Sequence, residues 1–100
     1  MNKEMTHLEI VEAIGQKIFD AFCLDVQRIT SIYTRRWEGS ALNRDLFLAN
    51  YKESLYASLQ RYQEFLNISG ANHEKRQSTK EMMRSVVSEA INNQESIFND

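Results

Sequence analysis

Apolar residues recur along most of the chain at steps of three, four or seven, which is the spacing of one face of an α-helix. The first such stretch starts at Thr6 and Glu9, which form the T-x-x-E capping box of a helix N-terminus. It stops before Gly39, a residue that suits the left-handed position after a helix end. We therefore predict a helix over residues 7–38, about 45 Å long. Its main apolar positions are Leu8, Val11, Ile18, Phe22, Val26, Ile29, Tyr33 and Trp37.

Further apolar residues widen this face, namely Ile10, Ile14, Phe19, Cys23 and Ile32. The apolar arc then covers roughly 220° of the helix, whereas a helix that lies on one core shows little more than 100°. The first helix must therefore be covered on more than one side. Gly15 lies within the arc, and two interpretations stay open. It either allows another backbone to approach closely, or it only weakens the helix by about 1 kcal/mol relative to alanine.

Two charged residues, Asp25 and Arg36, also fall within this arc. Since buried charges persist only when they are paired, Asp25 needs a partner if it is buried, and Arg28 has a suitable i, i+3 spacing. We expect the edge of the arc to be exposed to solvent at this point. Pairing across an interface is the alternative.

A second helix is predicted over residues 43–69, with Ser40 or Asn43 as its cap and Gly70 after its end. Its stripe follows the same 3-4 spacing, and two leucines and a tyrosine fall outside it. The stripe consists of Leu48, Tyr51, Leu55, Leu59, Tyr62 and Leu66, broadened by Phe47 and Phe65; the residues outside it are Leu42, Leu46 and Tyr56.

Residues 70–77 are polar and show no periodicity, which indicates a linker. Ser78 and Glu81 then form a second capping box, so a third and shorter helix is predicted over residues 79–97. The predicted fold class is all-α, with a single domain over residues 1–100. Two long antiparallel helices and a shorter third form a helical bundle, which we expect dimerisation to complete.

Composition narrows the possible classes of protein. The chain has 100 residues, 42% apolar and 26% charged, as expected for one small globular domain. A net charge of −2 gives no general attraction to nucleic acid or to acidic membranes. Cys23 is the only cysteine, and its apolar neighbours favour a buried thiol. The N-terminus lacks the apolar segment of a signal peptide, so we predict a cytoplasmic protein without a membrane anchor, with export without a cleaved signal as the alternative.

No set of residues has the spacing of a known catalytic or metal site. Glu4 and His7 have the Glu-x-x-His spacing, but the cap at Thr6 places Glu4 outside the helix and no second pair exists. Glu9 and Glu12 lack a second acidic pair on another helix. Because there is also no catalytic triad signature and no glycine-rich phosphate loop, we predict a protein that is not an enzyme, with no metal, cofactor or small-molecule substrate.

Charge is distributed unevenly along the chain. Residues 1–27 carry a local charge of −3 and residues 28–61 a local charge of +3. Basic residues also gather around the linker, where they could contact phosphates of a nucleic acid, or could simply be solvated beside Glu74 and Glu81. This basic group consists of Lys75, Arg76, Lys80 and Arg84.

Trp37-Glu38-Gly39 lies between two long amphipathic helices, followed by the small residues Ser40 and Ala41. In this respect residues 6–69 resemble the hundred-residue Trp-x-Gly family of type VII secretion substrates. The resemblance implies a helical hairpin with the motif at its turn, which dimerises as a four-helix bundle. The chain departs from the family in two ways. Tyr62 is followed four residues later by Leu66 rather than by the acidic residue of the export signal, and a capped third helix follows Gly70.

These observations favour a small interaction module, such as an adaptor, regulator, chaperone-like or immunity-type protein, that acts as a homodimer. A third helix of about 20 residues would leave part of the first helix uncovered. The expected interface residues are Ile10, Ile14, Ile18, Phe22, Ile29, Ile32, Trp37, Leu42, Leu46 and Tyr56. A secreted Trp-x-Gly substrate and a small nucleic-acid-binding regulator of phage or plasmid type are the alternatives.

Overall fold

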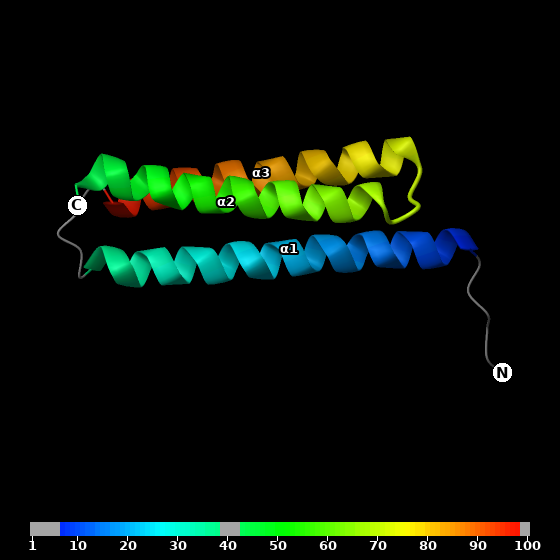
Figure 1. Cartoon of the computed structure of the whole chain (residues 1–100), viewed down its shortest axis with the longest axis horizontal. Coiled ribbons are helices and arrows are strands. Elements are labelled where there is room, and N and C mark those ends of the chain that lie inside the picture. The colour runs from blue at the N-terminus through cyan, green and yellow to red at the C-terminus, as the bar shows by residue number, and fades with distance from the viewer. Residues whose placement is uncertain (1–6, 39–42, 99–100) are drawn as a thin grey trace.

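The computed structural model describes residues 7–38 and 43–98, which form three α-helices (Figure 1). Helix α1 spans His7–Glu38, α2 spans Arg44–Asn67 and α3 spans His73–Phe98. The described residues contain no strand. The predicted all-α class is therefore confirmed, and the helices pack on one another as a three-helix bundle.

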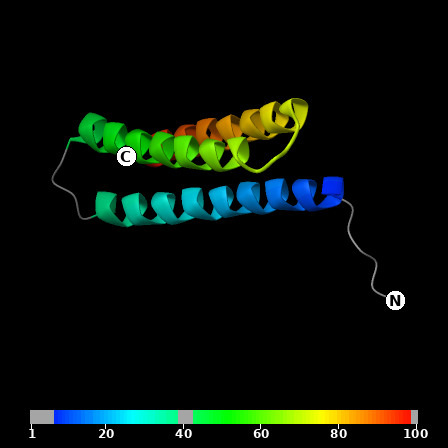
Figure 2. The same ribbon diagram turned by 45° about the vertical axis from the view of Figure 1, so that its right-hand side comes forward.

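The chain runs up and down along the bundle. Helix α2 is antiparallel to α1, and α3 runs antiparallel to α2 and parallel to α1 (Figures 1 and 2). The first turns of α1 reach beyond the loop that joins α2 to α3 in both views. We call this end of the bundle the loop end. One end of α1 therefore lies where neither of the other helices extends along it.

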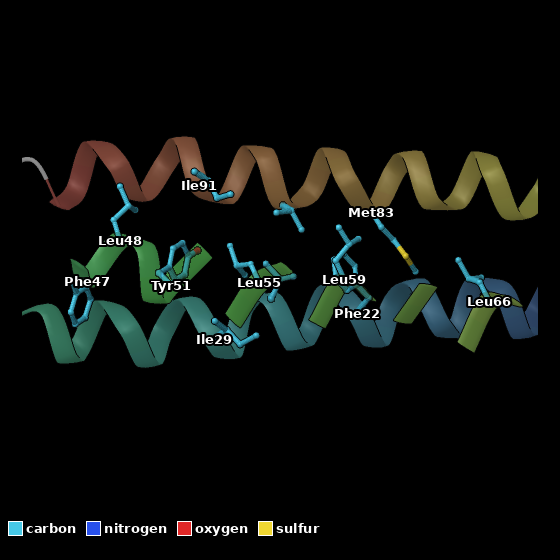
Figure 3. Packing of buried hydrophobic residues seen from close by; sticks show 12 residues of the cluster. Phe22, Ile29, Phe47, Leu48, Tyr51, Leu55, Leu59, Leu66, Met83 and Ile91 are labelled. Atoms are coloured by element: carbon cyan, nitrogen blue, oxygen red, sulfur yellow. The ribbon is translucent and has the colours of Figure 1, made fainter. Parts of the chain in front are cut away.

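All three helices contribute to one core. Among the described residues, six side chains are almost completely buried, and they come from α1, α2 and α3 alike (Figure 3). These residues are Phe22, Tyr51, Leu55, Leu66, Met83 and Val87. Each apolar stripe predicted from the sequence thus faces the same centre, and burial of these stripes is the main source of stability in a domain of this size.

Polar side chains inside the bundle are paired between helices, which fixes their register. The hydroxyl oxygens of Thr30 on α1 and Tyr51 on α2 lie 2.7 Å apart. The Thr34 hydroxyl donates to the side-chain oxygen of Gln94, a buried residue of α3, at 3.3 Å. Burial raises the pKa of the Tyr51 phenol, and the hydrogen bond with Thr30 opposes that rise.

Residues that cap or stop a helix set the boundaries of α2, and they can be recognised in the sequence. The Asn43 side chain accepts a hydrogen bond from the backbone N–H of Leu46 at 2.8 Å, so Asn43 is the N-cap. The helix ends at Asn67, and Gly70 follows with a φ of 86°, in the left-handed region that favours glycine. The predicted glycine stop is therefore confirmed, although the last helical residue comes before the predicted Ser69.

The predicted linker over residues 70–77 is wrong, because α3 begins at His73. Asn72 caps it: its side chain accepts from the backbone N–H of Lys75 at 2.8 Å, and its carbonyl accepts from that of Arg76 at 3.0 Å. Ser78 lies inside the helix and does not start it. Helix α3 has 26 residues and α2 has 24, so the third helix is not the shorter one. Its first turns escaped detection because almost all their residues are polar.

Gly15 is buried, but no other backbone approaches it closely. A β-carbon placed there would meet no heavy atom within 4 Å beyond its neighbours and the nearby backbone of its own helix. Of the two interpretations of Gly15, the structure excludes the close approach. Glycine therefore only weakens α1 at this position.

We expect Gly15→Ala to raise the free energy of unfolding by about 0.5–1 kcal/mol, because alanine restricts the unfolded chain and has room in the folded one. Urea denaturation followed by circular dichroism measures this change. An unchanged or lower stability would mean that the space beside Gly15 is filled in solution.

Candidate interaction surface

Four of the residues expected at an interface belong to the core or pack against it. Phe22 and Ile29 are buried inside a single chain, and Ile18 and Trp37 pack against the core cluster. The ring centroids of Trp37 and Phe47 lie 5.2 Å apart. Phe22 and Ile29 are therefore not available to a partner, and Ile18 and Trp37 are half-buried. The reason is the length of α3, which covers more of the wide apolar arc of α1 than a shorter helix could.

The other expected residues have different positions. Ile10, Ile14, Leu46 and Tyr56 are exposed, and Ile32 is half-buried. Leu42 lies outside the described residues, as do Gly39, Ser40 and Ala41 of the Trp-x-Gly resemblance. The exposed large apolar residues that sequence reasoning missed are Leu24, Phe65, Ile68 and Met82. Phe65 and Ile68 could have been found from their position in the last turn of α2 and at its cap.

Four exposed apolar residues gather at the loop end. Ile10 and Ile14 are one turn apart near the start of α1, and Phe65 and Ile68 lie at the end of α2. The Phe22 and Tyr62 rings are in contact with centroids 5.7 Å apart, and those of Tyr62 and Phe65 are 5.4 Å apart. The end of α2 therefore lies beside the part of α1 that precedes Phe22, and the first turns of α1 project beyond it (Figure 1). We call Ile10, Ile14, Phe65 and Ile68 the loop-end surface.

Helical periodicity places two of these residues on the same side of the bundle. Ile14 and Ile32 are separated by about five full turns of α1, so their side chains leave the helix in the same direction. The same holds for Phe65 and Phe47 on α2. Ile32 and Phe47 both line hollows between α1 and α2. Ile14 and Phe65 therefore continue that side of the molecule towards the loop end.

A hollow of about 250 Å³ separates α1 from α3 at the same end. Gly15 and Phe19 line it from α1, and Lys75, Thr79 and Met82 from α3. Met82 is 49% exposed. Helices α1 and α3 therefore lie side by side here without filling the space between them.

The middle of the α1–α2 side differs from the loop end, because an ion pair between a largely buried carboxylate and an exposed guanidinium lies there. The Asp25 side chain is only 11% exposed, and its Oδ1 accepts from Nη2 of Arg28 at 2.7 Å and from Nε at 3.1 Å. Its Oδ2 accepts from the hydroxyl of Ser58, a buried residue of α2, at 2.6 Å. The predicted Asp25–Arg28 pair is confirmed, whereas the expected solvent exposure of Asp25 is wrong.

Opposing effects act on the pKa of the Asp25 carboxyl. Burial raises this pKa. The hydrogen bonds from Ser58 and Arg28 and the charges of Arg28 and Arg61 lower it by more than burial raises it, so the pKa lies below its ordinary value. Asp25 is therefore ionised at neutral pH. It holds the Arg28 guanidinium at the surface of the α1–α2 side.

Two adjoining hollows form a groove along this side, which we call the arginine groove. One, of about 300 Å³, is lined by Arg28, Arg36 and Arg61 together with Asp25 and Ile32. The other, of about 380 Å³, extends towards Phe47. The two share the residues Tyr33, Arg36, Ser54 and Ala57. They are therefore continuous with each other.

The floor of the arginine groove is held in place by contacts between its residues. The hydroxyl oxygens of Tyr33 and Ser54 lie 2.8 Å apart and join α1 to α2. The Arg36 guanidinium carbon lies 5.9 Å from the centre of the Tyr33 ring, within the range of a cation–π contact. Arg36 thus lies over an aromatic surface of the groove.

The basic group proposed for phosphate contacts is partly engaged in structural bonds. Arg76 donates to the carbonyl of Ala71 at 2.6 Å, and Lys80 donates to the side-chain oxygen of Asn67 at 2.6 Å. Both bonds hold the turn between α2 and α3. Lys75 and Arg84 are exposed on α3. The structure therefore gives two of these four residues a role within the fold.

The described residues offer little for covalent or metal chemistry. Burial and the nearby charge of Asp20 raise the pKa of the Cys23 thiol, which lowers its reactivity. In the described ranges, no three His, Cys, Asp or Glu side chains are placed to hold a metal ion. None of the three helices, as far as they are described, has the length and apolar character needed to cross a bilayer.

Comparison with protein-family models, with curated proteins and with solved structures finds no match to this chain.

Proposed function

We propose that this protein is a small, non-enzymatic helical module that binds other proteins and acts as a homodimer. The observation that carries this proposal is the loop-end surface, where Ile10, Ile14, Phe65 and Ile68 are all at least 39% exposed at one end of the bundle. Complete burial of a large apolar side chain contributes about 1.5–3 kcal/mol, and each of these side chains forfeits the part that corresponds to its exposed surface. A surface that gathers four of them favours a partner.

A second copy of the chain is the partner that needs no further component. A twofold axis at the loop end would place the same apolar residues of two chains against each other, which is the commonest closed arrangement of identical subunits. The start of α1 supports this arrangement, because it extends beyond the α2–α3 loop and can be reached from several directions (Figure 2). The wide apolar arc of α1 then serves two purposes, the core along most of its length and the dimer at its first turns.

Sedimentation equilibrium at micromolar concentration tests this proposal. We expect the wild-type chain to give a mass near twice 11.7 kDa. Ile14→Asp should give a mass near 11.7 kDa, because a carboxylate buried in an apolar contact without a partner is strongly unfavourable.

Leu24→Asp is the matched control. Leu24 is more exposed than Ile14, at 66% against 39%, but it lies on α1 away from the loop end. This variant should remain dimeric, and both variants should keep the helical circular dichroism of the wild type. A monomeric wild type, or dissociation by Leu24→Asp to the same extent as by Ile14→Asp, would overturn the proposal.

A further inference from the structure

We propose that the arginine groove is a docking site for an acidic segment of a partner protein. This inference rests on the part of the proposed function that says the chain binds other proteins. It names the chemistry of a second partner, and it depends on other residues than the dimer contact. The relevant residues are Arg28, Arg36 and Arg61, which line one continuous groove between α1 and α2.

The Arg28 guanidinium is fixed in position and still has N–H groups that can donate to a ligand. Its Nε and Nη2 atoms donate to the Asp25 carboxylate, which Ser58 anchors from the neighbouring helix. The Arg28 side chain is nevertheless 61% exposed. A guanidinium has five N–H donors, so Arg28 keeps donors for a further carboxylate while its position is fixed.

Positive side chains outnumber negative ones in the lining of the groove. Its central hollow contains three guanidinium groups and one carboxylate, that of Asp25, which is already bonded to Arg28 and Ser58. The excess of positive charge belongs to a chain whose net charge is −2. The adjoining hollow adds the carboxylate of Glu53, so the local positive region that attracts carboxylates is the end of the groove with Arg28, Arg36 and Arg61.

The groove is larger than a small anion. Arg28 and Arg36 are about 12 Å apart along α1, and α2 rises about 21 Å between Phe47 and Arg61. The whole groove is therefore longer than one phosphate or carboxylate. An extended or helical segment with several acidic residues can reach all the arginines, and its apolar side chains would meet Ile32, Tyr33 and Phe47 in the same groove. Glu53 at the Phe47 end repels anions, so the acidic residues of the segment would lie at the end with Arg28 and Arg61.

The probe for this proposal is a fluorescein-labelled, amphipathic helical peptide of about four turns that carries glutamates on its polar face, to match the groove in length. The control peptide has glutamine in place of every glutamate. Fluorescence anisotropy with the full chain should show binding of the acidic peptide that weakens as salt is added, and no binding of the glutamine peptide. A DNA duplex of similar length and label should not bind.

Substitutions in the groove should change the affinity in both directions. We expect Arg28→Gln or Arg36→Gln to weaken binding of the acidic peptide about tenfold, the cost of one lost charge-assisted hydrogen-bond partner. Asp25→Asn should strengthen it about threefold, since it removes the carboxylate from the centre of the groove while its oxygen can still accept from Arg28. Arg84→Gln on α3 is the matched control and should leave the affinity within twofold of the wild type.

The following results would overturn the inference: no binding of the acidic peptide, equal binding of the DNA duplex, or equal weakening by Arg84→Gln and Arg28→Gln. The dimer is tested separately. If Ile14→Asp is monomeric and still binds the acidic peptide, the two surfaces act independently. If the wild type is monomeric but binds the peptide, the dimer fails and the arginine groove stands.

Discussion

Phe22→Ala should lower the free energy of unfolding by about 3–5 kcal/mol, which is a large part of the total for a domain of this size. Phe22 lies in the middle of α1 with no exposed surface, and its ring contacts that of Tyr62 on α2. Truncation removes the transfer free energy of the ring and leaves a cavity that three packed helices cannot easily close. Urea denaturation measures the loss through a lower midpoint.

Leu24→Ala is the control for Phe22→Ala. It lies two positions away in the same helix, but its side chain is 66% exposed, so we expect a change within about 0.5 kcal/mol. Equal effects of the two substitutions would mean that the side of α1 with Phe22 does not lie against the core.

Met83→Asp should abolish cooperative folding at neutral pH. Met83 has no exposed surface and lies in α3 opposite Leu59 and Phe22 in the core (Figure 3). A carboxylate at this position would have to be buried without a cationic partner or protonated, and either costs several kcal/mol. Thermal unfolding followed by circular dichroism should show the loss of the sigmoidal transition.

Met82→Asp is the control for Met83→Asp. It makes the same chemical change one residue earlier in α3, so the two variants share the loss of helix propensity and differ in the burial of the side chain. Met82 is 49% exposed, so its variant should unfold cooperatively within a few degrees of the wild type. If Met83→Asp also folded like the wild type, α3 would not belong to the core. The chain would then be closer to the two-helix hairpin that the Trp-x-Gly resemblance implies.

Local signals in the sequence account for most of the helix boundaries. The capping residue Asn43 and the glycine stop at Gly70 have the positions that were predicted for them, and α1 has the predicted bounds 7–38. These features depend on a few neighbouring residues, so a single sequence contains the information. The wide arc of α1 also predicted correctly that more than one helix covers it.

Features that depend on the relative register of helices were not accessible in this way. The start of α3 was missed because Asn72 competes with Ser78 as a cap, and the polar residues between them hide the periodicity. The partner of Asp25 on α2, Ser58, could not be found from spacing within one helix. For the same reason the arginine groove, which joins Arg61 to Arg28 and Arg36, becomes visible only when the helices are packed.

The most direct test of the proposed dimer is an isotope-filtered NOE experiment on an equimolar mixture of ¹³C-labelled and unlabelled chains. It detects only contacts between different copies. We expect intermolecular NOEs that involve the methyl groups of Ile10 and Ile14 and the residues Phe65 and Ile68. The absence of intermolecular NOEs, or their restriction to Leu24, Leu46 or Tyr56, would contradict this expectation.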